Sequence, residues 1–183
     1  MKKSILLLVA IVTLNQSLWA QEKRAAGKLF YSEMGGPGVI LSANFDSRFK
    51  PNERLGFGYR IGAGFGVGEF QELRIDRQRG TYHFNQVTKT YYSFPAGLNY
   101  VFGTPDEANT FEVGASVTIL SHRVSLYSPN EEKAGRVIGC ISFMYRMAPV
   151  NSGFSFRIGF TPMIGTSGEP FPIMGAVGIG YAF

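Results

Sequence analysis

Two-residue alternation between large apolar and small side chains is the feature that most restricts the fold of this 183-residue chain. The segment from Leu55 to Val67 shows it most clearly: odd positions carry apolar residues, and even positions carry glycine or Arg60. A period of two places successive side chains on opposite faces of a β-strand. Segments of this kind recur along the chain, which predicts an all-β fold.

The alternating segments are separated by short turns and longer segments in regular succession. Strands are predicted at 39–49, 55–67, 91–102, 111–119, 137–147, 153–164 and 171–183, with short turns at 50–53, 103–108 and 148–153 and external loops at 69–89, 121–136 and 165–170. Pro95 has no N–H donor, which predicts a local bulge.

These segments number seven, which is odd. A chain that begins and ends at the same end of a closed barrel needs an even number of strands. The weakly patterned segment 28–35 is therefore predicted to supply the eighth strand, with a tight link at 35–38.

The first twenty residues have the organisation of a cleavable secretory signal peptide. Lys2 and Lys3 precede an apolar run at 5–14, and Ala20 provides a small residue at the expected cleavage position. The run is too short for a membrane-spanning helix. Residues 21–27 are polar and are predicted to form a periplasmic lead-in, which leaves 28–183 as the folded domain.

Charge and composition exclude several classes of protein. The formal net charge of +5 is too small to indicate a nucleic-acid-binding protein, and the single cysteine, Cys140, excludes an intramolecular disulfide. The chain contains 23 glycines and 16 phenylalanines, yet no apolar run after residue 20 could form a membrane helix. Apolar residues that alternate with small or polar ones are typical of the strands of a transmembrane β-barrel.

The direction in which the large side chains point separates two barrel types. A soluble ligand-binding barrel would place them inside, whereas a membrane barrel would place them in lipid. The opposite face here consists mainly of Gly, Ala, Ser and Thr, which would make a poor water-facing surface. An eight-stranded barrel has an interior that side chains just fill, so we expect the small face inside and the large face in lipid.

A few charged residues lie on the small-residue face and are the first candidates for a functional site. They are Asp46, Arg48, Arg60, Glu112, Arg146 and Arg157. Such a cluster could form a proton path or a ligand site, since an unpaired buried charge is expensive. Mutual pairing that fills the interior satisfies the same residues, and we favour this structural role. No catalytic residue, metal or cofactor is predicted.

Other polar residues offer weaker candidates. Histidine occurs only at His83 and His122, in or beside predicted loops, and Ser121 and Ser125 lie near His122. Barrel enzymes that modify lipid A use a histidine, but the His-x-Ser spacing of the deacylase is absent here. Three arginines (Arg74, Arg77 and Arg79) form a basic segment that could meet lipopolysaccharide or could be an ordinary solvated loop.

The closing residues FPIMGAVGIGYAF, with Tyr181 and Phe183 on the large face, resemble the C-terminal signal that barrel-assembly machinery reads in outer-membrane proteins. With GLNYVFG at 97–103 and FRIGFTP at 156–162, the chain is similar to small barrels of the OmpA-transmembrane and OmpX-like kind and to single-domain barrels of Bacteroidota. The resemblance implies an eight-stranded antiparallel up-and-down transmembrane β-barrel. It also implies periplasmic termini, contact with outer-membrane lipid and lipopolysaccharide, and a monomer.

The sequence thus favours a non-enzymatic integral outer-membrane protein with a structural or surface-interaction role. Length and charge concentrate in the predicted loops at 69–89 and 121–136. A narrow solute channel and a lipid A modifying enzyme are the alternative hypotheses.

Overall fold

The computed structural model describes residues 26–76, 81–124, 135–165 and 173–183, and within these it describes no side chains at 69–86 and 123–124. The predicted signal peptide and most of the lead-in lie outside these ranges. The elements are β1 (Lys28–Gly35), η1 (Gly36–Gly38, a 3₁₀ turn), β2 (Leu41–Arg48), β3 (Gly56–Asp76), β4 (Thr81–Gly103), β5 (Asn109–Val124), β6 (Gly135–Met147), β7 (Gly153–Thr161), β8 (Met163–Gly165) and β9 (Met174–Ala182).

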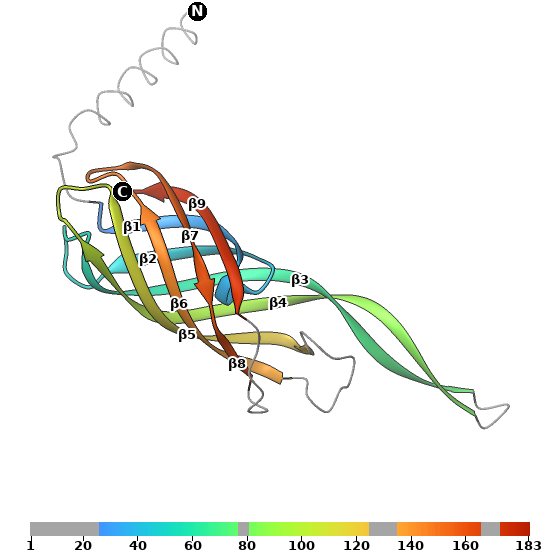
Figure 1. Ribbon diagram of the computed structural model, residues 1–183. Helices are drawn as coiled ribbons and strands as arrows, with labels where there is room; N and C mark the ends of the chain where they lie inside the picture. Colours follow the sequence, from blue (N-terminus) through green and yellow to red (C-terminus); the bar gives the residue numbers. More distant parts are fainter. Residues whose placement is uncertain (1–25, 77–80, 125–134, 166–172) are drawn as a thin grey trace, which may run out of the picture.

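These strands close into an antiparallel barrel (Figure 1). From β1 to β7 each strand pairs with the next along the chain, β7 pairs with β9, and β9 pairs with β1. The short β8 continues β7 beyond Pro162, because both pair with β6. Counted around the circumference, the barrel therefore has the eight strands that the sequence predicts.

The weakly patterned segment 28–35 forms β1, which completes the barrel. It pairs with β2 from Lys28 to Met34 and with β9 from Leu29 to Gly35. Because hydrogen-bonded neighbours flank β1 along its length, it is a full strand of the barrel and confirms the even strand count.

The two ends of the barrel differ. One end, here called the base, carries residues 26 and 183 and the short turns after β2, β4 and β6 (Figure 1). At the other, the hairpin end, β3 and β4 continue beyond the barrel as a two-stranded hairpin.

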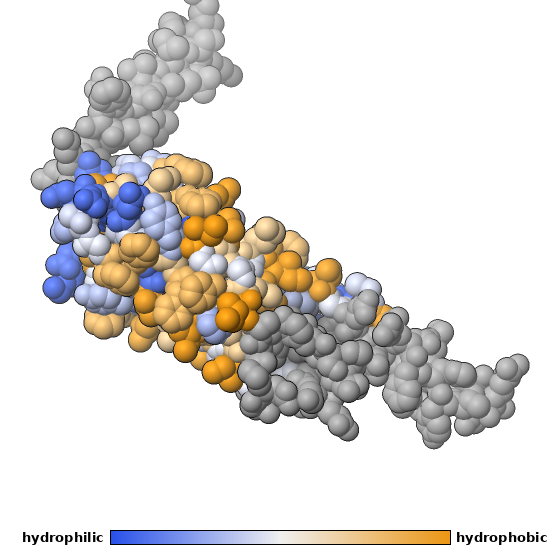
Figure 2. Space-filling model, in the orientation of Figure 1, coloured by the Kyte–Doolittle hydropathy of each residue, from blue (hydrophilic) through white to orange (hydrophobic). Residues whose placement is uncertain are grey.

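Large apolar side chains point outward and small or polar ones point inward, as expected. Along β5, Phe111, Val117 and Ile119 are exposed, whereas Glu112 and Thr118 are buried. The space-filling view shows apolar residues along the visible side of the wall and hydrophilic ones gathered at the base (Figure 2). This arrangement is the reverse of the soluble ligand-binding barrel considered above. Within the described residues, no helix is long and apolar enough to cross a membrane.

Aromatic residues form a continuous row around part of the outer wall near the base. Neighbouring rings lie 4.7 to 6.5 Å apart, from centroid to centroid, along the series Phe57, Tyr100, Phe102, Phe111 and Tyr145. The row crosses β3, β4, β5 and β6. Aromatic belts of this kind flank the apolar band of outer-membrane barrels.

Glycines on the inner face create room for the large arginines. A Cβ added at Gly58 would lie 2.4 Å from Cζ of Arg48, and one at Gly178 would lie 2.7 Å from Cγ of Arg157. The small face is therefore matched in shape to a few long side chains, as the sequence predicts.

Three local expectations differ from the structure. The segment 69–89 is expected as an external loop whose base extends the barrel strands; the strands do extend, but much further than expected, because β3 and β4 pair regularly from Glu69↔Thr88 to Asp76↔Thr81. Pro95 causes no bulge: the β3–β4 register is the same on both sides of it, and only the pairing opposite it is interrupted. Val39 was expected on the outer face of a strand, but it precedes β2 and is buried inside the barrel.

Candidate functional site

The barrel brings the six predicted charged residues together in its interior, and all six are buried. With Glu33 of β1 they form a chain in which arginines and carboxylates alternate. Its order is Arg48, Asp46, Arg146, Glu112, Arg157, Glu33 and Arg60. We call these seven residues the interior network.

The half of the network nearest the base is centred on Asp46. Its Oδ1 lies 2.6 Å from Nη2 of Arg48 and 3.3 Å from Nη1 of Arg146. The amide of Asn99 donates to the other Asp46 oxygen and accepts a hydrogen bond from Arg48. Arg48 also donates to the carbonyl of Gly56. Besides Arg48 on its own strand, Asp46 thus has partners on β4 and β6, which fixes β2 against the opposite wall of the barrel.

The other half is centred on Glu112 and Arg157. Glu112 accepts hydrogen bonds of 3.0 Å from both Arg146 and Arg157. Arg157 lies over the ring of Tyr31, with Cζ 4.2 Å from the centroid. The Tyr31 hydroxyl accepts a 3.2 Å hydrogen bond from Arg60. The guanidinium of Arg157 therefore makes both a cation–π contact with Tyr31 and an ion pair with Glu112.

Glu33 is the member of the network that the sequence interpretation missed. Its carboxylate lies 3.2 Å from Nε of Arg157 and 3.9 Å from Nη1 of Arg60. Neither contact has hydrogen-bond geometry, so charge alone holds these groups together. The sequence does contain an indication of its position. Glu33 is the only acidic residue in 28–35, and it lies on the face of the strand opposite Phe30 and Met34.

The network gives every buried carboxylate two arginine neighbours and contains one guanidinium more than it has carboxylates. Buried ion pairs recover their desolvation cost only when the geometry is good and the remaining polar atoms have partners. The alternating order gives Asp46 and Glu112 two arginine partners each. The network also joins β1, β2, β3, β5, β6 and β7 across the interior of the barrel.

The link between β1 and β2 seals the interior at the hairpin end. Every residue of η1 is buried. The carbonyl of Pro37 accepts a 2.6 Å hydrogen bond from Thr118, and that of Gly38 accepts one of 2.8 Å from Ser93. These donors lie on β5 and β4, so the link folds into the bore instead of projecting outward.

An apolar cluster lies beside this inward link. It consists of Val39, Tyr91, Leu120, Ile138, Cys140 and Met163. Val39 adopts φ 76°, which is unusual for a β-branched residue and costs of order 1–3 kcal/mol. Packing of this cluster offsets that strain. Cys140 belongs to it as a small buried side chain.

At the base, Arg54 links the short turns by hydrogen bonds to their backbone carbonyls. From the turn after β2, its guanidinium donates to the carbonyls of Pro105 and Glu107 in the next base turn and to that of Ala148 in the third. Burial, and then the charge of Arg146, lowers the pKa of Arg54, but a guanidinium remains protonated at neutral pH. One side chain therefore connects all three short turns.

The Ser121–His122 pair, a candidate for enzyme chemistry, lies on the outer side of β5. Ser121 Oγ is 2.9 Å from Nδ1 of His122 and also accepts a 2.9 Å hydrogen bond from the backbone N–H of Tyr92. The β5–β6 register shifts between Ile119 and Val124. Ser121 thus lies in a segment where the register shifts, and its hydroxyl also supports the backbone of β4.

The remaining sequence candidates have simpler outcomes. Ser125, Arg77 and Arg79 lie outside the described residues, as does the loop between β5 and β6; the side chains of Arg74 and His83 are not described. Tyr181 and Phe183 are exposed on the outer face at the base, and their recognition by assembly machinery remains a prediction. No group of metal-binding side chains occurs among the described residues.

Comparison with known proteins found no matching family model, no matching curated protein and no matching solved structure. The functional interpretation therefore depends on the barrel and its interior.

Proposed function

We propose that this chain is an integral outer-membrane β-barrel protein with a closed, side-chain-filled interior, and that it acts in a structural or surface-interaction role through the segments at its hairpin end. The observation that carries the proposal is the outward band of large apolar side chains around a polar core. In water this band would be an exposed apolar surface far larger than soluble proteins tolerate. In a bilayer it is the expected lipid-facing surface.

In this proposal the base faces the periplasm and the hairpin end faces outward. Short turns on the periplasmic side and longer external segments are the usual arrangement in outer-membrane barrels. The β3–β4 hairpin supports a surface-interaction role, because beyond Leu41↔Phe65 and Ser93↔Leu120 its described strands pair only with each other. Free strand edges are available for pairing with another chain.

Cell fractionation combined with heat-modifiable gel mobility tests the membrane part of the proposal. The protein should separate with outer membranes and migrate faster before boiling than after it. A freely soluble protein in the periplasm or medium would contradict the proposal.

The surface-interaction part is tested by replacing the hairpin and the 125–134 segment with short turns. Adhesion, stress-resistance and envelope phenotypes of the intact gene should be lost while the barrel remains in the membrane. Unchanged phenotypes would contradict this part alone.

The alternative of a narrow solute channel has less support. The interior network, the inward link and Arg54 all obstruct the bore. Steady open-state current of the purified barrel in a planar bilayer would favour the channel over the closed barrel.

A lipid A modifying enzyme is the second alternative, and its specific support is the 2.9 Å Ser121–His122 contact. Mass spectrometry of lipid A from cells with and without the protein would expose an acyl change. His122→Ala should abolish such a change, whereas an unchanged lipid A profile would leave Ser121 with its structural role.

A further inference from the structure

A small groove at the base shares one residue, Arg48, with the interior network and does not include Arg54. It has a volume of about 190 Å³ and lies where β1 begins, β2 ends and Phe183 closes the chain. This space corresponds to roughly six water molecules at about 30 Å³ each. It is therefore large enough for the polar part of a small ligand.

The charged side chains that line the groove are all basic: Lys28, Arg48 and Lys50. Phe183, which also lines it, carries the terminal carboxylate of this sequence. Arg48 directs its guanidinium inward to Asp46 and Asn99, which leaves the two lysines as the cations available at the groove. Lys50 is largely exposed and lies 3.5 Å from Glu53, a surface contact that stabilises little. Among the described residues that line the groove, none has a carboxylate side chain.

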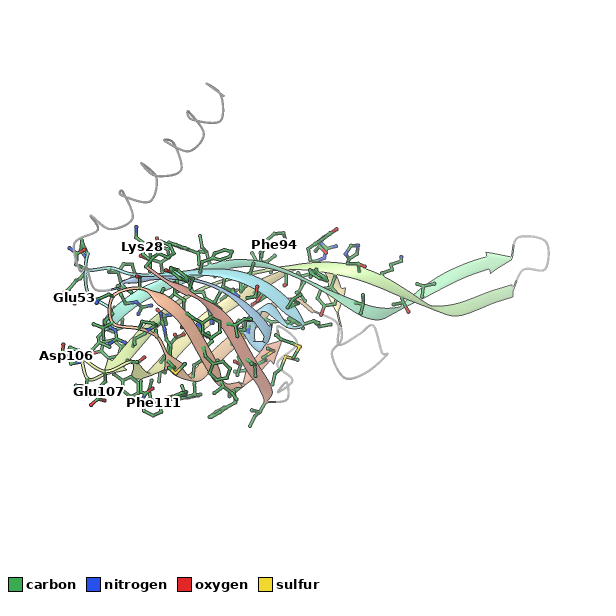
Figure 3. All side chains as sticks on the ribbon, turned by 90° about the horizontal axis from the view of Figure 1, so that it is seen from above. Lys28, Glu53, Phe94, Asp106, Glu107 and Phe111 are labelled. Carbon is green, nitrogen blue, oxygen red and sulfur yellow. The ribbon has the colours of Figure 1, made fainter. Side chains whose placement is uncertain are left out.

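Apart from Glu53, which contacts Lys50, the acidic residues of the base lie elsewhere. Asp106 and Glu107 belong to the turn after β4, and the view from above shows them across the base from Lys28 (Figure 3). The charge of the base is therefore divided, and the groove lies on its basic side.

Aromatic side chains continue from the groove onto the outer wall. Phe183 lines the groove and its ring centroid is 6.5 Å from that of Phe45. Tyr59 follows at 6.4 Å from Phe45, and Phe49 at 5.9 Å from Tyr59. A ligand in the groove would thus have cations at one end and a ring-covered apolar surface beside it.

We propose that this groove binds the anionic headgroup of a phospholipid in the periplasmic leaflet, with its acyl chains lying along Phe45, Phe49 and Tyr59. The proposal rests on the proposed membrane location. Lysine ammonium groups bind phosphate as point charges, basic residues at a bilayer surface attract anionic lipid, and aromatic rings sit at headgroup level. The combination of charge and aromatic surface selects a lipid over a free phosphate.

Native mass spectrometry of the full chain, refolded in a neutral detergent, tests this site. Phosphatidylglycerol should remain bound in preference to phosphatidylcholine. The double variant Lys28→Gln/Lys50→Gln should weaken phosphatidylglycerol binding by about fivefold per lysine. Arg136→Gln is the matched control, because Arg136 is an exposed cation at the other end of β6, and it should leave binding unchanged.

Heat-modifiable mobility of each variant shows that the barrel has folded. Equal losses in the lysine and Arg136 variants, or no loss in the lysine variant, would overturn the site. Complete displacement by soluble glycerol phosphate would also overturn it, because the acyl chains would then contribute nothing. A folded barrel that inserts into bilayers without lipid preference contradicts only this inference, whereas failure to insert into any bilayer contradicts the proposed function as well.

Discussion

Glu112 is the residue on which the interior network depends most, because it accepts hydrogen bonds from both Arg146 and Arg157. Replacing Glu112 with Gln keeps its shape but leaves two buried guanidinium groups without their shared counter-charge. Breaking a buried pair in this way costs about 3–5 kcal/mol. Urea denaturation of the barrel refolded in lipid vesicles should show this loss.

Glu107→Gln provides the matched control, since Glu107 is exposed in a base turn and surface substitutions usually change stability by about 0.5 kcal/mol or less. If the two variants had the same denaturation midpoint, the network would have no stabilising role.

Gly35 and Gly175 face each other where the chain turns into the bore, and they should differ in their tolerance of a methyl group. Gly35 has φ +76°, and a Cβ there would lie 2.0 Å from the carbonyl oxygen of Gly175. Gly35→Ala should therefore destabilise the barrel by more than the 1–3 kcal/mol of left-handed strain alone. Gly175→Ala meets nothing within 4 Å and should be close to neutral in the same unfolding measurement. Equal stability of both variants would contradict the described path of the link.

At the scale of elements, the β3–β4 hairpin should be dispensable for folding. Glu69 and Thr88 are paired, so replacing 70–87 with Asn-Gly would close the two strands with a favoured two-residue turn. All the pairing between neighbouring barrel strands would remain. The shortened protein should keep its heat-modifiable mobility and its denaturation midpoint. Loss of folding would show that the hairpin belongs to the barrel core.

The sequence predicts the strands well and the links poorly. Alternation identifies strands because one side of each must be large and apolar and the other small. It says nothing about a link such as 36–38, whose inward path depends on Thr118 and Ser93, distant residues that donate to its carbonyls. In 69–89 the sequence predicts an extension of the strands but not its length, because the charged residues suggest a loop, whereas regular pairing of the two arms overrides composition.

In the candidate site, the sequence likewise identifies residues that stand out from a strand face and misses those whose role depends on distant partners. The six charged residues were identifiable because each interrupts a small-residue face. Glu33 was missed because its strand also places Leu29 and Tyr31 inside, so the usual contrast between faces is weak there. Arg54 was missed because its partners are backbone carbonyls in two other turns, which no local pattern indicates.

At the scale of the whole molecule, a charged residue on the outer wall should reduce stability more near the middle of the wall than at the base. Val117 is exposed midway along β5, beside Ala96, which in turn pairs with Ile61. Val117→Arg should cost about 2–4 kcal/mol in a bilayer, as measured by unfolding from vesicles. Thr104→Arg, in an exposed base turn, should be nearly neutral. Equal tolerance at both positions would mean that Val117 is not in hydrocarbon.

The most direct test of the proposal that the outer wall faces lipid is a spin-label scan of residues 111–119 in lipid vesicles, with Cys140 first replaced by Ser. Labels at 111, 113, 115, 117 and 119 should be accessible to oxygen dissolved in the bilayer and protected from a water-soluble relaxation agent. Labels at the even positions should be protected from both. A flat profile, or odd positions open to the water-soluble agent, would contradict a barrel whose large side chains face lipid around a closed polar interior.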